Sequence, residues 1–303
     1  MLNLKVINYR KHAALLSAFI IFIGIISLIF NGLNLGIDFT GGTNLHYKIG
    51  EPFQVEEVRE ILEEFGLGGS FVQKVGHGGL AEEEKDEVLI KTVSLDEEER
   101  NQIFMAIQER WDQGETEIIE VENVGGVIGR ELQRDAALAL VIATLGMIAY
   151  ITIRFEFRFA MSAIAALVHD IIILLTVVSL LQIEINSPFV AAILTIFGYS
   201  INDTIVVFDR IRENLKEMKK EDYATVVNDS INQTIIRSIN TSVTTLLVLS
   251  ALFIFGGVTL RPFIAALLVG VISGTYSSLF VASPLWVTWK EWDIRKKKKV
   301  EAF

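Results

Sequence analysis

Long apolar runs alternate with short polar links over most of this 303-residue chain. The first run, residues 13–30, is uninterrupted and about as long as a helix needs to be to cross a bilayer. Five more runs follow after residue 135, and together the six predict a polytopic α-helical membrane protein with six transmembrane helices. The later runs cover residues 136–153, 160–181, 189–208, 241–258 and 263–285.

The first run follows a basic start that contains Lys5, Arg10 and Lys11. A basic segment before an apolar one is also the pattern of a cleaved signal peptide. This run has full membrane length, however, and the NGLNLGIDF that follows it offers no small-x-small cleavage site. We therefore expect a retained first helix whose N-terminus lies in the cytoplasm.

Residues 31–135 have a different pattern, in which short strands alternate with amphipathic helices. Asp96 with Glu99 three residues later forms a capping box at the start of one of these helices. The order of elements is β-α-β-β-α-β, which is the split βαβ or ferredoxin-like plan. The expected strands cover 43–49, 70–75, 87–93 and 116–121, the helices begin at 54 and 96, and a loop with Gly76, Gly78 and Gly79 joins the middle strands.

The charge is concentrated in this α+β segment, which holds 24 acidic and 9 basic residues, whereas the whole chain has a net charge of −10. An acidic surface argues against nucleic acid as a partner. The chain has no cysteine, which excludes disulfides, a thiolate nucleophile and a cysteine-type zinc site.

The remaining basic residues predict the orientation of the helices. With the N-terminus inside, the short cytoplasmic segments hold 17 Lys and Arg, and the short external links hold only Arg261. Both termini are then cytoplasmic and the acidic domain is external. The predicted parts are a cytoplasmic N-terminus with the first helix (1–30), an external ferredoxin-like domain with a glycine hinge (31–135), helices two to six (136–285) and a basic cytoplasmic tail (286–303).

The fourth run carries Tyr199, Asn202 and Asp203 inside its apolar sequence. A carboxylate at bilayer depth costs roughly 3 kcal/mol or more, so it is a functional hypothesis by default. On a helical wheel these residues share one face with Thr195 and Gly198, which predicts that this face meets another helix or a wet cavity. The alternative is a buried polar residue that only holds helices together.

Two further features have more than one interpretation. His169 and Asp170, near the centre of the third run, suit either a proton-handling pair or a pair that bridges helices. Gly125, Gly126 and Gly129 lie before the second run and superficially suggest a dinucleotide loop. The full spacing of that motif is missing, and a flexible joint between the external domain and the membrane is the better interpretation.

Enzymatic motifs are not evident. The four histidines, at positions 12, 46, 77 and 169, are scattered, and there is neither an HExxH motif nor a P-loop. An intramembrane aspartyl protease would pair two carboxylates, but Asp203 lies in SINDT and not in the GxGD pattern of that class. We therefore expect a protein that is not an enzyme and needs no cofactor or metal.

Several motifs resemble those of a known family over essentially the whole chain. They are GIDFTGGT at 36–43, VGGVIGREL at 124–132, VHD at 168–170, GYSINDTIVVFDRIREN at 198–214, RSINTS at 237–242 and GTYSSLFVASPL at 274–285. Together they resemble the SecF family of protein-export membrane subunits of the Sec translocase, which is related to the resistance–nodulation–division transporters. The chain departs from the family at Gly126, where proline is common, and this leaves the stiffness of the joint open.

The resemblance implies partners and a task. Members of that family work with SecD beside the SecYEG channel, often with YajC, and use the proton gradient to promote export of an unfolded preprotein across the cytoplasmic membrane. The residues linked to proton use in the family correspond here to Asp203 and Arg237, and we expect Asn202, Asp170 and His169 to take part in proton coupling with them. We expect Arg237 at the inner end of the fifth helix, where its side chain could reach Asp203. The proton would then be carried by Asp203, because arginine stays charged.

Two other functions remain open from the sequence. A proton-driven exporter of small molecules or lipids from the same superfamily would use a similar membrane carboxylate, but usually with a larger, pocketed external region. A passive scaffold would need no buried ionisable group. The terminal RKKKK suits a solvated flank attracted to anionic membrane lipid, with a docking role as the alternative.

Overall fold

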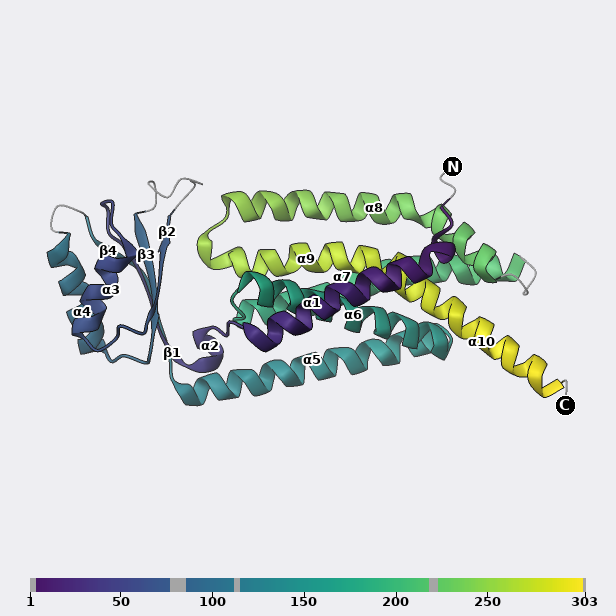
Figure 1. Ribbon diagram of the computed structural model, residues 1–303, viewed down its shortest axis with the longest axis horizontal. Coiled ribbons are helices and arrows are strands. Elements are labelled where there is room, and N and C mark those ends of the chain that lie inside the picture. Colours follow the sequence, from purple (N-terminus) through teal and green to yellow (C-terminus); the bar gives the residue numbers. More distant parts are fainter. Residues whose placement is uncertain (1–3, 77–85, 112–114, 218–222, 302–303) are drawn as a thin grey trace.

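The computed structural model describes residues 4–76, 86–111, 115–217 and 223–301. A bundle of long helices carries a small β-sheet domain at one end, and α1 starts and α10 ends at the opposite end of the bundle (Figure 1). Among the described residues, six helices are long and apolar enough to cross a membrane. The predicted six-helix membrane architecture is confirmed, whereas the expected loop around Gly78 and Gly79 lies outside the described residues.

The six spans coincide with the apolar runs but are longer than them, because backbone hydrogen bonding continues where the side chains become polar. The charged stretch 209–238, expected as a link, is formed mostly by the end of one helix and the start of the next. Arg237 therefore lies in the middle of α8 and not at its beginning. The spans are the short η1 (Val6–Tyr9) with α1 (Arg10–Phe30), α5 (Gly126–Arg154), α6 (Phe157–Leu181), α7 (Ser187–Glu217), α8 (Tyr223–Phe255) and a last composite helix.

The last helix contains an irregular turn. After η3 (Val258–Leu260), α9 (Arg261–Ser277) runs into a π-helical turn, η4 (Ser278–Ala282), and continues as α10 (Ser283–Glu301). Pro284 explains the position of this turn, because proline has no N–H and its ring clashes with the carbonyl group four residues earlier in a regular helix. The boundary expected at residue 286 falls inside α10, and Trp286 there is fully buried.

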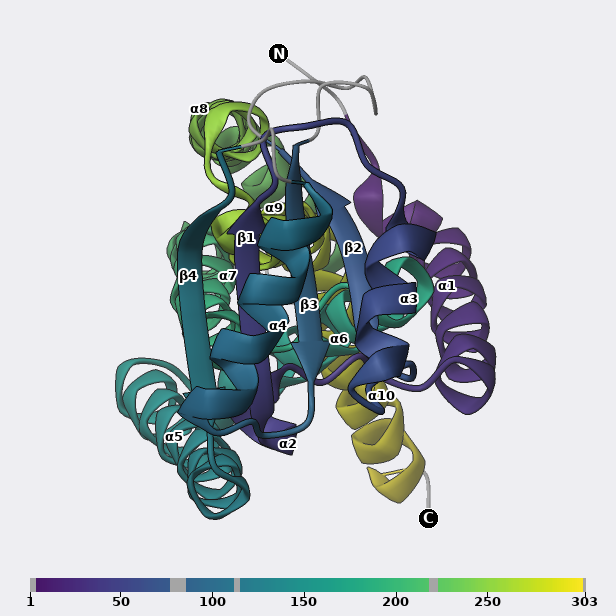
Figure 2. The same cartoon turned by 90° about the vertical axis from the view of Figure 1, so that its left-hand side faces the viewer.

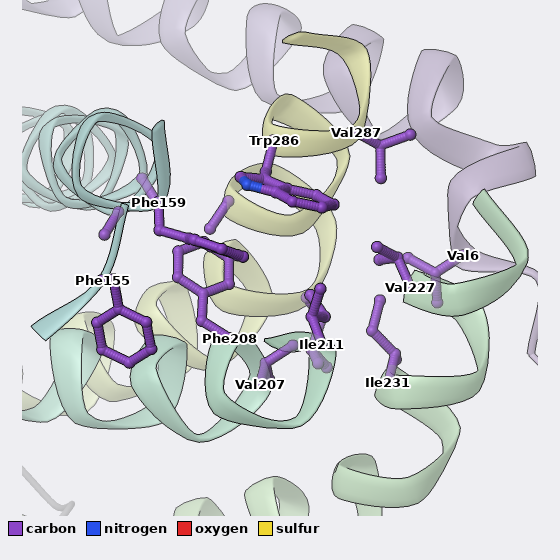
Figure 3. Packing of buried hydrophobic residues seen from close by; sticks show 14 of the residues in the cluster. Val6, Phe155, Phe159, Val207, Phe208, Ile211, Val227, Ile231, Trp286 and Val287 are labelled. Carbon is purple, nitrogen blue, oxygen red and sulfur yellow. The ribbon is translucent and has the colours of Figure 1, made fainter. Parts of the chain in front are cut away.

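Aromatic and aliphatic side chains fill the end of the bundle far from the sheet (Figure 3). The indole of Trp286 stacks on Phe159 with ring centroids 4.7 Å apart and planes 14° apart. Phe159 in turn contacts Phe208 of α7, with centroids 4.8 Å apart. This cluster fixes α10 against α6 and α7, since large-to-small substitutions of buried aromatic residues cost about 3–5 kcal/mol.

The sheet domain, residues 42–124, has the strand order β2-β3-β1-β4, and all neighbouring strands are antiparallel. Two helices cover the face of the sheet that is turned away from the bundle (Figure 2). This is the ferredoxin-like arrangement that the sequence predicts. Its elements are β1 (Gly42–Lys48), α3 (Val55–Glu64), β2 (Phe71–Val75), β3 (Glu87–Thr92), α4 (Glu97–Arg110) and β4 (Glu117–Val124).

Alternation along the strands explains the core of this domain, because every second side chain of β1 and β3 points to the helices. Leu45 and Tyr47 of β1 are buried there, and the Tyr47 ring meets Phe104 of α4 edge to face, with centroids 5.4 Å apart. Burial raises the pKa of Tyr47 to about 12, although the nearby positive charge of Arg100 opposes the shift. The capping box is confirmed, because Asp96 accepts a hydrogen bond from the Glu99 backbone N–H.

The segment between α1 and the sheet is tied to the bundle. It contains the short α2 (Ile37–Thr40), and Leu35 forms an isolated parallel bridge with Ile185 in the link between α6 and α7. The Asp38 carboxylate accepts a hydrogen bond of 2.6 Å from the backbone N–H of Ser187, the first residue of α7. An ion pair between Lys91 of β3 and Glu184 adds a second connection. The sheet domain is thus connected directly to the N-terminus of α7.

Candidate functional site

The polar residues of α7 differ in how far they are exposed. Thr195, Gly198 and Asn202 are exposed, Tyr199 is half-buried, and Asp203 is only 8 % exposed. The opposite, apolar face is packed inside the protein and not turned toward lipid. That face includes Ile193, Ile196, Ile201, Thr204 and Phe208, all of which are buried.

Two serine hydroxyls from different elements hold the Asp203 carboxylate. Ser238 of α8 donates to Oδ1 at 2.6 Å, and Ser278, the first residue of the π-helical turn, donates to Oδ2 at 2.5 Å. Such short O–H···O⁻ distances are typical of charge-assisted hydrogen bonds. Each carboxylate oxygen therefore has a donor, and α7, α8 and η4 meet at this side chain.

A small cavity of about 120 Å³ lies beside Asp203. Such a volume accommodates several water molecules next to polar partners. Its walls come from α7 and α8, and they include the exposed Arg237 side chain. The described residues contain no ion pair between Arg237 and Asp203, so the two groups share a cavity without the direct contact that was expected. The remaining lining residues are Tyr199, Asn202, Val206 and Thr241.

A second buried carboxylate lies deeper in the bundle. Asp170 of α6 is 1 % exposed and accepts hydrogen bonds from three serines. Ser273 donates to Oδ1 at 2.6 Å, whereas Ser200 and Ser277 each donate to Oδ2 at 2.7 Å. These serines come from α7 and α9, so Asp170 bridges three helices.

His169 extends this cluster to α1. Its Nδ1 lies 3.2 Å from Asp170 Oδ1, and its Nε2 lies 3.0 Å from Ser17 Oγ. The Tyr276 ring of α9 stacks on the imidazole with centroids 5.9 Å apart. The pair therefore bridges helices, which was one of its two expected roles, and its geometry also permits proton handling.

The serine donors are the part of the site that sequence reasoning missed. Ser273, Ser277 and Ser278 could be recognised only as small residues that allow helices to approach closely. Their hydroxyls become carboxylate ligands because two other helices bring Asp170 and Asp203 next to them. Groups of three or more His, Cys, Asp or Glu that could hold a metal ion do not occur within the part of the chain that the structure describes.

The three glycines of the predicted hinge lie at the start of a helix. Gly125 is the N-cap of α5, and Gly126 and Gly129 lie in its first turn. A Cβ atom at Gly129 would come within 3.1 Å of the Phe39 carbonyl oxygen, so this glycine also allows close contact with the segment before β1. Hinge motion at these residues stays a prediction.

The chain matches known membrane proteins over nearly its full length. Residues 103–292 match the family described as Protein export membrane protein SecD/SecF, C-terminal, and residues 26–47 match the SecD/SecF GG Motif. A "Protein translocase subunit SecF" from Sebaldella termitidis is 43% identical over 285 residues, which cover 94% of this chain and 91% of that protein. The subunit of the same name from Acidaminococcus fermentans is 43% identical over 292 residues, or 95% of this chain and 99% of that protein.

Two solved structures have a similar fold. The crystal structure of SecDF, a translocon-associated membrane protein from Thermus thermophilus, has a TM-score of 0.86 and 36% sequence identity, and the match covers 96% of this chain. A crystal structure of SecDF in a super-membrane-facing form has a TM-score of 0.65 at 39% identity over 97% of this chain. In both cases the match spans only 39% of the longer SecDF chain.

Proposed function

The chain belongs to the SecD/SecF family of protein-export membrane proteins, and from this premise we propose that it uses a proton gradient at Asp203 to promote export. It is an accessory subunit of the Sec protein translocase. Its substrate is an unfolded preprotein, and its task is to help move that chain across the cytoplasmic membrane.

The observation that carries the proposal is the environment of Asp203. This carboxylate is buried among serine hydroxyls on one side and borders a small cavity on the other. A proton that enters the cavity reaches Asp203 Oδ2 or Oδ1 and forms an O–H bond there, which removes the charge. Arg237 stays protonated at all relevant pH values and sets the positive potential of the cavity. Asn202 and Tyr199 supply further hydrogen-bonding groups to the waters that deliver the proton.

Asp170 and His169 have a supporting role in this proposal. They lie behind the Asp203 site and are satisfied by serines from α7 and α9 and by Ser17. A buried carboxylate with several donors is held rigidly, because breaking any one hydrogen bond leaves a costly unpaired group. We propose that this cluster holds the helices around Asp203 in one arrangement at a time.

The exposed polar stripe of α7 supports a partner in the membrane. Asn202 would otherwise meet hydrocarbon, where an unsatisfied polar group is expensive. The neighbouring α5 and α8 are also largely unburied, with apolar surfaces such as Leu145 and Leu247 exposed. We propose that SecD covers this surface, that SecYEG and YajC are further partners, and that lipid surrounds the remainder.

The placement in the membrane follows from charge. Both ends of the described chain lie at the end of the bundle away from the sheet domain (Figure 1), as expected for two cytoplasmic termini. The basic residues of the short links favour the same orientation. The acidic sheet domain is then external, where it can meet the emerging preprotein.

Motion of the external domain completes the proposal. Gly125, Gly126 and Gly129 adjoin the sheet and have little side chain to restrain the backbone. The TM-scores of 0.86 and 0.65 against two SecDF structures of similar sequence identity support a family in which parts can reorient. We propose that these glycines form the hinge between the sheet domain and α5.

Replacement of Asp203 by asparagine tests the proposal. The amide keeps the size of the side chain but replaces one acceptor oxygen by an N–H donor, and it cannot bind and release a proton. In membrane vesicles, Asp203→Asn should retain assembly and lose the increase in preprotein translocation that an imposed proton gradient gives. The control is Asp135→Asn, which changes an exposed carboxylate on α5 and should keep the increase. Full gradient-dependent export by Asp203→Asn would refute the proposed role.

A further inference from the structure

Two consecutive serines contact two different buried carboxylates. Ser277 donates to Asp170 and Ser278 donates to Asp203, at 2.7 and 2.5 Å. Both serines are fully buried, so water cannot replace either bond. One peptide unit therefore connects the two acidic groups of the bundle.

This pair lies where the helix changes its hydrogen-bonding pattern. Ser277 ends α9 and Ser278 begins the π-helical turn η4. The hydroxyl of Ser283 donates back to the Ser278 carbonyl at 3.0 Å and spans the turn. Single π-helical turns are rare interruptions of the regular helical hydrogen-bonding pattern and occur frequently at functional sites. The backbone at Ser278 can therefore adjust at less cost than the backbone of α7.

We infer that Ser278 is a positioning residue that transmits protonation of Asp203 through the π-helical turn to Asp170 and to α10. The inference rests on the proposed proton binding at Asp203. It assigns a role to a residue other than Asp203 and Arg237, and Ser278 itself gains or loses no proton.

The chemistry of the hydrogen bonds supplies the mechanism. The Asp203 carboxylate accepts from both Ser238 and Ser278. When a proton binds at Oδ2, that oxygen becomes an O–H donor and a weaker acceptor, so its O–H can point to Ser278 Oγ while the Ser278 hydroxyl donates to another group. Ser278 has a second acceptor already within reach, since its hydroxyl lies 3.1 Å from the Thr275 carbonyl oxygen. Release of Ser278 then alters the turn and, through the adjacent peptide, the position of Ser277 at Asp170.

Few charged or titratable side chains face Asp203 and Asp170. Arg237 of α8 and Tyr199 of α7 line the cavity beside Asp203, and His169 of α6 with Tyr276 of α9 adjoins Asp170. Among these groups, His169 carries the imidazole, the side-chain type that exchanges protons in many pH-sensitive proteins. It lies on the far side of Asp170, and a response that starts there would not require Asp203.

The turn also controls the position of α10. Trp286 lies four residues after the turn and stacks on Phe159 in the cluster of Figure 3. A displaced turn therefore moves a ring that is fully buried at the end of the bundle away from the sheet. Movement of α10 relative to α6 is the expected consequence.

Spin labels can measure this movement, because the chain has no native cysteine. One label is placed at Leu285→Cys on α10 and one at Val168→Cys on α6, two positions that are exposed. The full chain with its co-purified membrane partner is reconstituted in lipid vesicles. The distance distribution between the labels is then recorded at about pH 4 and about pH 8, so that the lower value reaches the range, about 3.9, in which aspartate carboxylates ordinarily bind a proton.

We expect the distance distribution to shift between the two pH values and the shift to be lost in Ser278→Ala. The matched control is Ser238→Ala, which removes the other hydroxyl on Asp203 but leaves the turn intact, and it should keep the shift. Folding of each variant is checked by its distance distribution at the higher pH, which should equal that of the parent.

The outcomes separate the two proposals. Loss of the shift in Asp203→Asn and in Ser278→Ala, with the shift kept in Ser238→Ala, supports the inference. Three outcomes overturn the role of Ser278 and leave the export role of Asp203 intact. The shift persists in Ser278→Ala, or it is lost equally in Ser238→Ala, or the parent shows no shift. A shift that persists in Asp203→Asn places its origin elsewhere, such as at His169, and overturns the inference, whereas the proton site itself is decided by the export assay of Asp203→Asn.

Discussion

Close packing of α7 on α9 gives a sharp prediction at Gly270. A Cβ atom added there would lie 2.3 Å from both Cγ1 and Cδ1 of Ile196 and 2.8 Å from its Cγ2. Carbon atoms in contact normally lie about 3.5–4.0 Å apart, so the overlap exceeds about 1 Å. Ile196 is 2 % exposed and β-branched, and it has no open space into which it can turn. Gly270→Ala must therefore push the two helices apart.

The magnitude follows from two opposing effects. Overpacking of a buried site costs about 1–3 kcal/mol, and the size of this overlap points to the upper end. Replacing glycine by alanine inside a helix returns about 1 kcal/mol. We expect Gly270→Ala to lower the free energy of unfolding by about 2 kcal/mol. Gly198→Ala on α7 is the control, because nothing lies within 4 Å of its added Cβ, and this variant should be about 1 kcal/mol more stable than the parent.

Thermal unfolding in detergent, followed by tryptophan fluorescence at one fixed heating rate, compares the variants. Adding Ile196→Ala to Gly270→Ala removes all three overlapping atoms, so the double variant should lose less stability than the sum of the single variants. A coupling of about 1–3 kcal/mol is expected for residues in direct contact. Equal stability of Gly270→Ala and Gly198→Ala would refute the close packing of α7 on α9.

Two further predictions concern the sheet domain. Folding raises the pKa of Tyr47 to about 12, so the protonated side chain contributes about 2–3 kcal/mol to the free energy of unfolding. This contribution is complete below about pH 10 and is lost as the pH rises toward 12. Tyr47→Phe should shift the alkaline unfolding transition of the full chain, followed by circular dichroism, to higher pH, and an unchanged transition would contradict this. Asp96→Ala removes the cap of α4 and should cost about 1 kcal/mol in thermal stability, whereas Asp96→Asn should cost little, since asparagine caps equally well.

The general architecture could be predicted because it depends on local patterns. Six apolar runs give six membrane helices, and alternating strands with a capping box at Asp96 give the split βαβ domain. The lengths of α7 and α8 could not be read from hydropathy. Hydropathy reports which residues suit lipid, whereas a helix continues into water as long as its backbone bonds are satisfied, as α7 does up to Glu217.

The ionisable residues of the site could be named from the sequence, but the serine donors could not. Asp203 is conspicuous because a carboxylate inside an apolar run is rare. Its partners Ser238 and Ser278 are ordinary small residues in sequence, and their role depends on which helices lie side by side. The same limit applies to Gly129, whose sequence context suggests backbone freedom. In the fold, a Cβ atom added to Gly129 would lie 3.1 Å from the Phe39 carbonyl oxygen.

The helices around Asp203 are packed with different tightness. This difference determines how each helix can move when the charge of Asp203 changes. At one end α7 is tied through Ser187 to Asp38 of α2, in the segment before the sheet domain, and it packs along α9 so closely that Gly270 has no room for a methyl group. Asp203 lies sixteen residues along this rigid helix, about 24 Å from the contact with Asp38. By contrast, α8 leaves Leu247 and Val248 more than half exposed. Of the two long helices that meet at Asp203, α8 is therefore the less firmly held, whereas α7 would carry a displacement that starts at the turn of Ser278 as a unit toward the sheet domain.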